Sequence, residues 1–198
     1  MHTDARQRLR VLLIDGAPGR AALLERALTD AGHHVAARIE SSEGLLRRVV
    51  DVQPDVIIVD LESPDRDTLE NLTAVNRAVP RPIVMFAEDE QSGAIQAAIR
   101  AGVSAYVVEG VSNTRVRPLL EVAVARFREY QALRDELEKT RESLAERKLV
   151  DKAKGVLMKQ RGCDEDAAYQ LLRKAAMDRG QRIAEVAKGL ISAAELLG

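Results

Sequence analysis

The sequence predicts an α/β protein in which a doubly wound, five-stranded parallel sheet precedes a long helix and a small helical bundle. Three observations lead to this prediction. Short apolar runs alternate with helical segments in the first part of the chain, a long stretch carries apolar residues at heptad spacing, and the last part contains amphipathic helical segments. Only 3% of the residues are aromatic while 46% are hydrophobic, a composition that favours helices over an all-β design.

The predicted strands are the apolar runs Leu9–Ile14, Val35–Ile39, Val56–Val59, Ile83–Phe86 and Ala105–Val108. The third run is apolar throughout, as expected for a parallel strand covered on both faces. Helical spacing of apolar residues fills the segments between the runs. We expect Ser42 to cap the second of these helices, and Gly32 and Gly102 to close the first and fourth. Such alternation defines a flavodoxin-like sheet.

Four residues directly follow predicted strands, and we expect them at the carboxyl edge of the sheet, where doubly wound folds place their functional crevice. They are Asp15, Asp60, Ala87 and Glu109. The carboxylates among them could in principle bind a metal, so an enzyme is one hypothesis. No nucleophile–base pair accompanies them, and we therefore predict no catalytic residue, no metal site and no cofactor.

This front part resembles the receiver domain of bacterial response regulators, over about residues 8–126. The resemblance rests on Asp15, Asp60, the strand Pro82–Ala87 and the run Ala101–Tyr106. It implies that Asp60 is the candidate phosphoacceptor, beside a Mg²⁺ site formed with an acidic pair after the first strand. It also implies a hydroxyl after the fourth strand and a Lys after the fifth, which hold the phosphate oxygens.

The sequence departs from the receiver pattern at three of these positions. Gly16 replaces the second acid, Ala87 the hydroxyl and Glu109 the Lys. Each change weakens phosphoryl chemistry, and Glu109 would repel both phosphate and Asp60. We expect a pseudo-receiver without efficient phosphorylation, in which Asp60 has either a structural or a signalling role. The acidic segment Leu61–Asp67 beside the crevice is either a partner surface or a loop that caps the next helix.

A long helix is predicted from about Val116 to Lys159, since its only Pro lies near the start. Apolar residues at 3-, 4- and 7-residue spacing, flanked by mixed charges, are typical of a coiled coil. These residues are Tyr130, Leu133, Leu137 and Leu144. A homodimer through this seam is our prediction, and the alternative is a helix that lies on its own domain. The expected domains are 1–120, 121–145 (the coiled-coil linker) and 146–198.

Residues 146–198 contain eleven Lys/Arg and eight Asp/Glu, whereas the whole chain has a net charge of −1. Apolar spacing predicts three short helices here, with Asp164 capping the second and Gly180 ending it. We place Met158 and Met177 in the core of this bundle. The basic excess indicates a polyanion-binding surface, although charges that merely solvate helices would give the same composition.

The tail resembles the ANTAR RNA-binding domain in the order and spacing of short blocks, among them Ala153–Met158, Ala168-Tyr169 and Val186-Ala187. The resemblance implies RNA hairpins as ligands, and Lys and Arg supply phosphate affinity. The candidate RNA-binding residues are Arg147, Lys148, Lys152, Ala153, Lys154, Gly155, Lys159, Arg161, Tyr169, Arg173 and Arg182. For Ala153 and Gly155 close helix packing is the alternative, and for Tyr169 a half-buried packing ring.

With its receiver-like front, the whole chain resembles the AmiR/NasT antiterminators, closest to the NasT type of nitrate and nitrite assimilation. The resemblance implies a regulator that binds hairpins in nascent leader mRNA and is restrained by a nitrate-sensing partner, NasS. A phosphorylation-controlled ANTAR regulator of another pathway and a DNA-binding response regulator remain alternatives. The chain has one Cys and no apolar run long enough to span a membrane, so we expect a cytoplasmic protein without disulfides.

Overall fold

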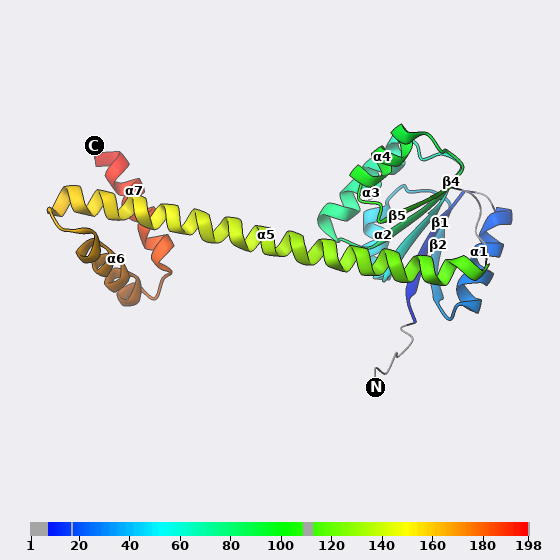
Figure 1. The fold of residues 1–198 in the computed structure, drawn as a ribbon, viewed down its shortest axis with the longest axis horizontal. Helices are drawn as coiled ribbons and strands as arrows, with labels where there is room; N and C mark the ends of the chain where they lie inside the picture. The colour runs from blue at the N-terminus through cyan, green and yellow to red at the C-terminus, as the bar shows by residue number, and fades with distance from the viewer. Residues whose placement is uncertain (1–7, 17, 109–112, 198) are drawn as a thin grey trace. The chain divides into compact units, whose positions relative to one another are not determined.

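The computed structural model shown in Figure 1 describes residues 8–16, 18–108 and 113–197. Within it the chain divides into two compact units, Met1–Gln131 and Ala132–Gly198. The first unit contains the sheet and the second unit contains the helical bundle, in the order that the sequence predicted. In the described residues no helix is both long enough and apolar enough to cross a membrane.

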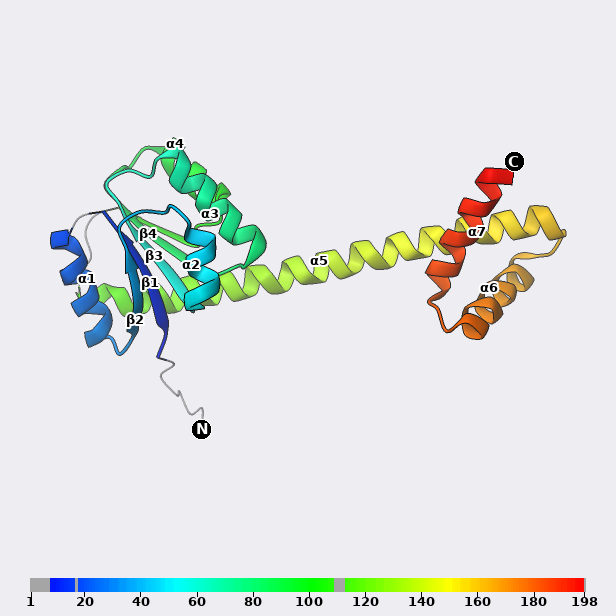
Figure 2. The same cartoon turned by 180° about the vertical axis from the view of Figure 1, so that it is seen from behind.

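A five-stranded parallel sheet forms the centre of the first unit, with the strand order β2-β1-β3-β4-β5. This confirms the predicted fold class. The strands are β1 (Arg10–Asp15), β2 (His34–Ile39), β3 (Val56–Asp60), β4 (Ile83–Ala87) and β5 (Ala105–Val108). Every residue of β3 and β4 is buried, because helices cover both faces of the sheet (Figures 1 and 2).

Two apolar layers hold these helices on the sheet. On one face α1 (Pro18–Asp30) and the start of α5 (Asn113–Arg161) pack through Leu24, Leu28, Val116 and Leu120. On the other face lie α2 (Leu45–Val52), α3 (Arg66–Ala78) and α4 (Ser92–Arg100), which contribute Leu45, Val49, Leu72, Val75 and Ala98. Successive side chains of a strand point to opposite faces, so β1 supplies both layers.

Local backbone chemistry confirms two expected helix ends and corrects an expected helix start. Gly32 closes α1 with a φ of 88° and Gly102 closes α4 with a φ of 100°, a conformation that favours glycine. Ser42 does not cap α2, because the N-cap residue is Gly44. The Ser42 hydroxyl is instead buried, donates to the Thr68 hydroxyl at 3.3 Å and accepts from the Asn71 amide at 3.2 Å. Ser42 therefore joins the β2–α2 segment to α3.

Helix α5 contributes residues to both units. Val116, Leu120 and Ala123 are buried against the sheet in the first unit, and Ala153 and Leu157 are buried in the second. Between these ends the predicted seam residues are exposed by half or more. They are Tyr130, Leu133, Leu137 and Leu144. Within the described residues, three of the four, Leu133, Leu137 and Leu144, do not pack on a domain of their own chain, whereas Tyr130 also lines a pocket with Asn76 and Ile99 of the first unit.

The second unit packs the end of α5 against α6 (Glu165–Arg179) and α7 (Ile183–Leu197). Its small core consists of Ala153, Leu157, Ala168, Leu172, Ala176, Val186, Ala187 and Ile191. Asp164 caps α6 as predicted, since its Oδ1 accepts from the Ala167 amide at 2.8 Å, and Gly180 ends the helix. The prediction that Met158 and Met177 belong to the core is wrong: they are 38% and 72% exposed. The core is built largely from short Ala side chains, and both Met side chains face solvent at least in part.

Candidate functional site

The carboxyl edge of the sheet brings two acids together. Asp15 ends β1 and Asp60 ends β3, and the two are register partners on adjacent parallel strands. Both are buried, with 0% and 6% of their surface exposed. Burying two neighbouring carboxylates costs free energy unless other groups stabilise their charge or a proton neutralises one of them. The parallel pairing of the strands that precede them thus creates the acidic site that the sequence predicted.

Other residues at this edge differ from those of a receiver domain that accepts a phosphoryl group. Ala87 ends β4 and is buried, so a methyl group stands where a hydroxyl would donate to phosphate. Gly16 offers no carboxylate beside Asp15. Glu109, the fourth predicted pocket residue, lies outside the described residues. Two carboxylates without the third acid do not fit the Mg²⁺ site of such receivers, and we derive no metal-dependent step.

Tyr106 on β5 is fixed beside this edge. Its hydroxyl donates to the main-chain carbonyl of Asp89 at 2.8 Å. Burial raises the pKa of Tyr106, and the Asp89 carboxylate raises it further. The phenol is therefore neutral at physiological pH and ties β5 to the segment between β4 and α4. The segment itself is held to the neighbouring loop by a long hydrogen bond from Ser63 to Asp89.

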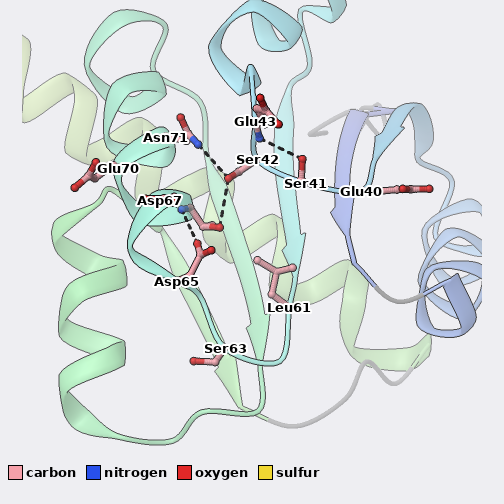
Figure 3. A pocket seen from close by; sticks show the side chains of 11 residues that line it. Glu40, Ser41, Ser42, Glu43, Leu61, Ser63, Asp65, Asp67, Glu70 and Asn71 are labelled. Atoms are coloured by element: carbon pink, nitrogen blue, oxygen red, sulfur yellow. Dashed lines mark hydrogen bonds between the residues drawn. The ribbon is translucent and has the colours of Figure 1, made fainter.

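The segment Leu61–Asp67 caps a helix and also lines a pocket. Asp65 is the N-cap of α3, and its Oδ1 accepts from the Thr68 amide at 2.7 Å. Hydrogen bonds from Thr68 lower the pKa of Asp65. The capping interpretation is therefore confirmed. Beside the cap, a pocket of about 590 Å³ opens between the β2–α2 and β3–α3 segments (Figure 3). Its lining includes the carboxylates of Glu40, Glu43, Asp65, Asp67 and Glu70.

In the second unit, the predicted RNA-binding cations fall into two groups. Five are exposed and form no ion pair with the described residues: Arg147, Lys148, Lys159, Arg161 and Arg173. Lys152 pairs with Glu195 at 2.7 Å, and Arg182 lies 3.6 Å from Glu146. Both pairs are exposed, so an RNA phosphate can compete for these cations at little cost.

Lys154 is the most enclosed of these cations, with 15% of its side chain exposed. Its Nζ lies 2.6 Å from Asp151 on the same helix and 2.7 Å from Glu165 on α6. Hydrogen bonds to Asp151 and Glu165 raise the pKa of Lys154. This side chain therefore joins α5 to α6, and a phosphate would have to displace two carboxylates to reach it.

The uncharged candidates for RNA binding also differ in how far they are buried. Ala153 is completely buried in the core of the second unit, which corrects our placement of this residue at the RNA surface. Gly155 has no atom within 4 Å of the position a Cβ would take, so it does not serve close helix packing. Tyr169 is 42% exposed and available to a ligand. Sequence reasoning missed the exposed cations Lys174 and Arg179 on α6, although they follow Arg173 on the same helix.

Comparison with solved structures shows the class of the first unit. The signal receiver domain of a modulated diguanylate cyclase from Desulfovibrio desulfuricans superposes with a TM-score of 0.56 at 21% identity, covering 63% of this chain and 99% of that domain. A response regulator from Chloroflexus aurantiacus gives a TM-score of 0.54 at 24% identity, with coverage of 60% and 99%. The first unit therefore has the fold of a signal receiver domain.

Family models describe more of the chain. The response regulator receiver domain matches residues 11–121, and the ANTAR domain matches residues 138–191. The chain thus belongs to the response regulators and joins a receiver domain to an ANTAR domain. The transcriptional regulatory protein PdtaR of Mycobacterium tuberculosis is 32% identical over 166 residues, 82% of this chain and 81% of PdtaR. The nitrate regulatory protein of Klebsiella oxytoca is 42% identical over 76 residues, 38% of this chain and 19% of that protein.

Proposed function

We propose that this protein is a transcription antitermination regulator, not an enzyme, and that its second unit (residues 132–198, the ANTAR unit) binds hairpins in nascent leader mRNA. The observation that carries the proposal is the coincidence of two independent findings. The ANTAR match covers residues 138–191, and the same residues carry exposed cations outside any ion pair among the described residues. Binding a hairpin would prevent formation of a terminator hairpin, so that transcription continues.

The surface chemistry of the second unit suits a folded RNA. Arg147, Lys148 and Lys159 on α5 supply charge for phosphates, which provide most of the affinity in such complexes. Tyr169 and Arg173 lie one helical turn apart on α6, where a ring and a guanidinium group can stack on the unpaired bases of a loop. Duplex DNA keeps its bases stacked and offers no such contact.

Filter binding of the full chain tests this function. The first probe is a hairpin RNA that the protein selects from a pool with randomised loops. The second is a two-stranded RNA duplex of the same stem, which has no loop, and the third is duplex DNA of the stem sequence. We expect the looped RNA to bind more tightly than both others, with an affinity that falls steeply with salt. Equal or tighter binding to DNA would support the DNA-binding alternative and refute the proposal.

We also propose that two copies of the chain pair through the exposed seam of α5. We assign Tyr130 and Leu137 to the a positions of successive heptads. Glu129 then occupies the g position before Tyr130, and Arg134 occupies the e position after it. Glu136 and Arg141 repeat this arrangement one heptad later. A parallel pair in register sets each Glu opposite an Arg of the other copy, whereas an antiparallel pair sets like charges together.

Sedimentation and cross-linking test the pairing. Leu137→Glu should shift the chain toward monomer, whereas Lys139→Glu, at an outward position of the same helix, should not. In a Cys163→Ser background, Tyr130→Cys and Leu144→Cys should each form a disulfide with the same residue of a second copy. A parallel seam brings identical positions together along its whole length. Cross-linking at only one of the two would contradict the parallel arrangement.

For the input, we propose control by a sensor protein rather than by phosphorylation, in nitrate or nitrite assimilation with a NasS-like partner. The degenerate edge around Asp60 and Ala87 supports the first part, and similarity to the Klebsiella oxytoca nitrate regulatory protein supports the second. The acidic pocket beside Leu61–Asp67 is a candidate surface for that partner. Pull-down with the sensor, with and without nitrate, tests the pathway.

The alternative of phosphorylation control keeps Asp60 as acceptor and predicts that acetyl phosphate raises RNA affinity.

A further inference from the structure

A groove in the second unit contains Arg161 but none of the other RNA-binding candidates that the sequence predicted. It opens where the end of α5 meets α6 and α7, and it has a volume of about 460 Å³. Pockets for small molecules typically measure about 300–1,000 Å³. The groove is therefore large enough to accept one flat ring with the sugar attached to it.

Apolar side chains form much of the lining. Leu157, Leu172 and Val186 belong to the core of the unit and reach the groove from three different helices. Leu171, directly before the buried Leu172, is 38% exposed and lines the groove at its surface. An aromatic ring placed here would cover apolar surface that water otherwise contacts.

Cations surround this apolar surface. Arg161 ends α5, and Lys174 and Arg179 lie on α6; all three are exposed, and none forms an ion pair with a described residue. Asp178 is the one carboxylate in the lining. Other cations of the unit, such as Lys152 and Lys154, already have carboxylate partners. The lining therefore carries net positive charge that complements an anion.

Gly189 gives a second, independent indication that something enters the groove. It lies in the middle of α7, where glycine destabilises a helix relative to alanine. No atom lies within 4 Å of the position its Cβ would take, so packing within the chain does not require glycine. A side chain at this position would project from α7 beside the groove. Its absence leaves room for another molecule to approach the backbone.

We propose that this groove receives an unpaired base of the RNA loop, with Arg161, Lys174 and Arg179 contacting the phosphates on either side of it. The inference rests on the proposed function and assigns a base-binding site within it. The ANTAR match includes all but one residue of the lining, which favours RNA over a protein segment as the occupant. An apolar slot with a cationic rim combines ring stacking with phosphate attraction.

Gly189→Leu in the full chain tests the site, because it fills the groove while removing a helix-destabilising residue. The probe is the loop hairpin selected by the wild-type protein, and the matched control is Ser192→Leu, on the exposed surface of the same helix outside the groove. We expect Gly189→Leu to melt at the same or a higher temperature and to bind at least tenfold more weakly. Ser192→Leu should bind within about twofold of the wild type.

Charge and base chemistry provide two further measurements. Lys174→Ala should weaken binding about fivefold and lower the salt dependence by about one phosphate contact, whereas Lys188→Ala, outside the groove, should do neither. Replacing loop nucleotides one at a time with abasic sugars should reveal a position whose loss weakens the wild type but no longer affects Gly189→Leu. A wild type that binds no hairpin refutes the proposed function. A wild type that binds, with Gly189→Leu equally tight, refutes the groove alone.

Discussion

The two units use their charged residues in opposite ways. In the first unit (the receiver unit), Asp15 and Asp60 are buried at the ends of two apolar strands, so the chemistry of the site and the stability of the sheet depend on the same residues. In the ANTAR unit the core cluster is apolar, and the predicted RNA-binding cations other than Lys154 are exposed. Function and folding can therefore be separated by mutation in the second unit far more cleanly than in the first.

The small core of the ANTAR unit gives the largest expected effect. Leu172 is buried on α6, and its neighbour Leu171 is partly exposed. Leu172→Ala should destabilise the unit by about 3 kcal/mol, the usual cost of a cavity left by leucine, and should abolish RNA binding. Leu171→Ala should cost less than about 1 kcal/mol. Hydrogen exchange will show whether loss of protection is confined to residues 132–198, and an equal loss in the sheet would contradict two separable units.

Next in size is a contrast between two of the cations that the sequence predicted to bind RNA. Arg173→Ala should lower RNA affinity about tenfold, or ~1.4 kcal/mol, and reduce the salt dependence by about one contact, while the melting temperature stays unchanged. Lys154→Ala removes the partner of Asp151 and Glu165 and should mainly lower the melting temperature, with the salt dependence preserved. If Lys154→Ala instead reduced the salt dependence, Lys154 would be a phosphate contact despite its enclosure.

The accuracy of the predictions made from the sequence also differs between the units. Apolar runs located all five strands, because a strand covered on both faces leaves a local pattern that needs no knowledge of its neighbours. The same holds for Asp164, whose capping role depends on the residues immediately after it. Ala153 was misplaced because a small residue on a helix fits both a ligand surface and a close helix contact, and only the tertiary structure distinguishes the two.

Contacts between distant residues could not be predicted at all. The Lys154–Glu165 pair joins two helices, and the spacing of charges along one helix carries no information about it. The hydrogen bonds of Ser42 to Thr68 and Asn71 arise in the same way from a loop and a helix that meet only after folding. The groove lined by Gly189 could have been anticipated only in part, since a glycine in the middle of a helix is a signal that needs explanation.

A smaller effect concerns pH and the receiver unit. Burial lowers the pKa of His33, and the nearby positive charge of Arg117 lowers it further, against the opposing charge of Glu121. The folded chain therefore favours neutral His33, and protonation favours unfolding. Stability from this residue is complete above the unfolded pKa of about 6.5 and decreases as the pH falls below it. His33→Gln should flatten the melting temperature between pH 7 and 5, whereas the exposed neighbour His34→Gln should not.

The smallest expected effect is at the site that looks most functional. Asp60→Asn keeps the size of the side chain but removes the negative charge and the candidate phosphoacceptor. Because Ala87 supplies no hydroxyl and Gly16 no second acid, we expect antitermination and RNA affinity to remain within about twofold of the wild type, with or without acetyl phosphate. A leader–reporter fusion and filter binding measure the two quantities.

Asp60→Ala provides the second variant, and the melting temperature separates its packing effect from any signalling effect. A strong loss of antitermination in both variants, with an unchanged melting temperature, would mean that the buried acid pair controls the ANTAR unit. The contrast between the two units would then hold for where their charged residues lie, but not for which of them act in regulation.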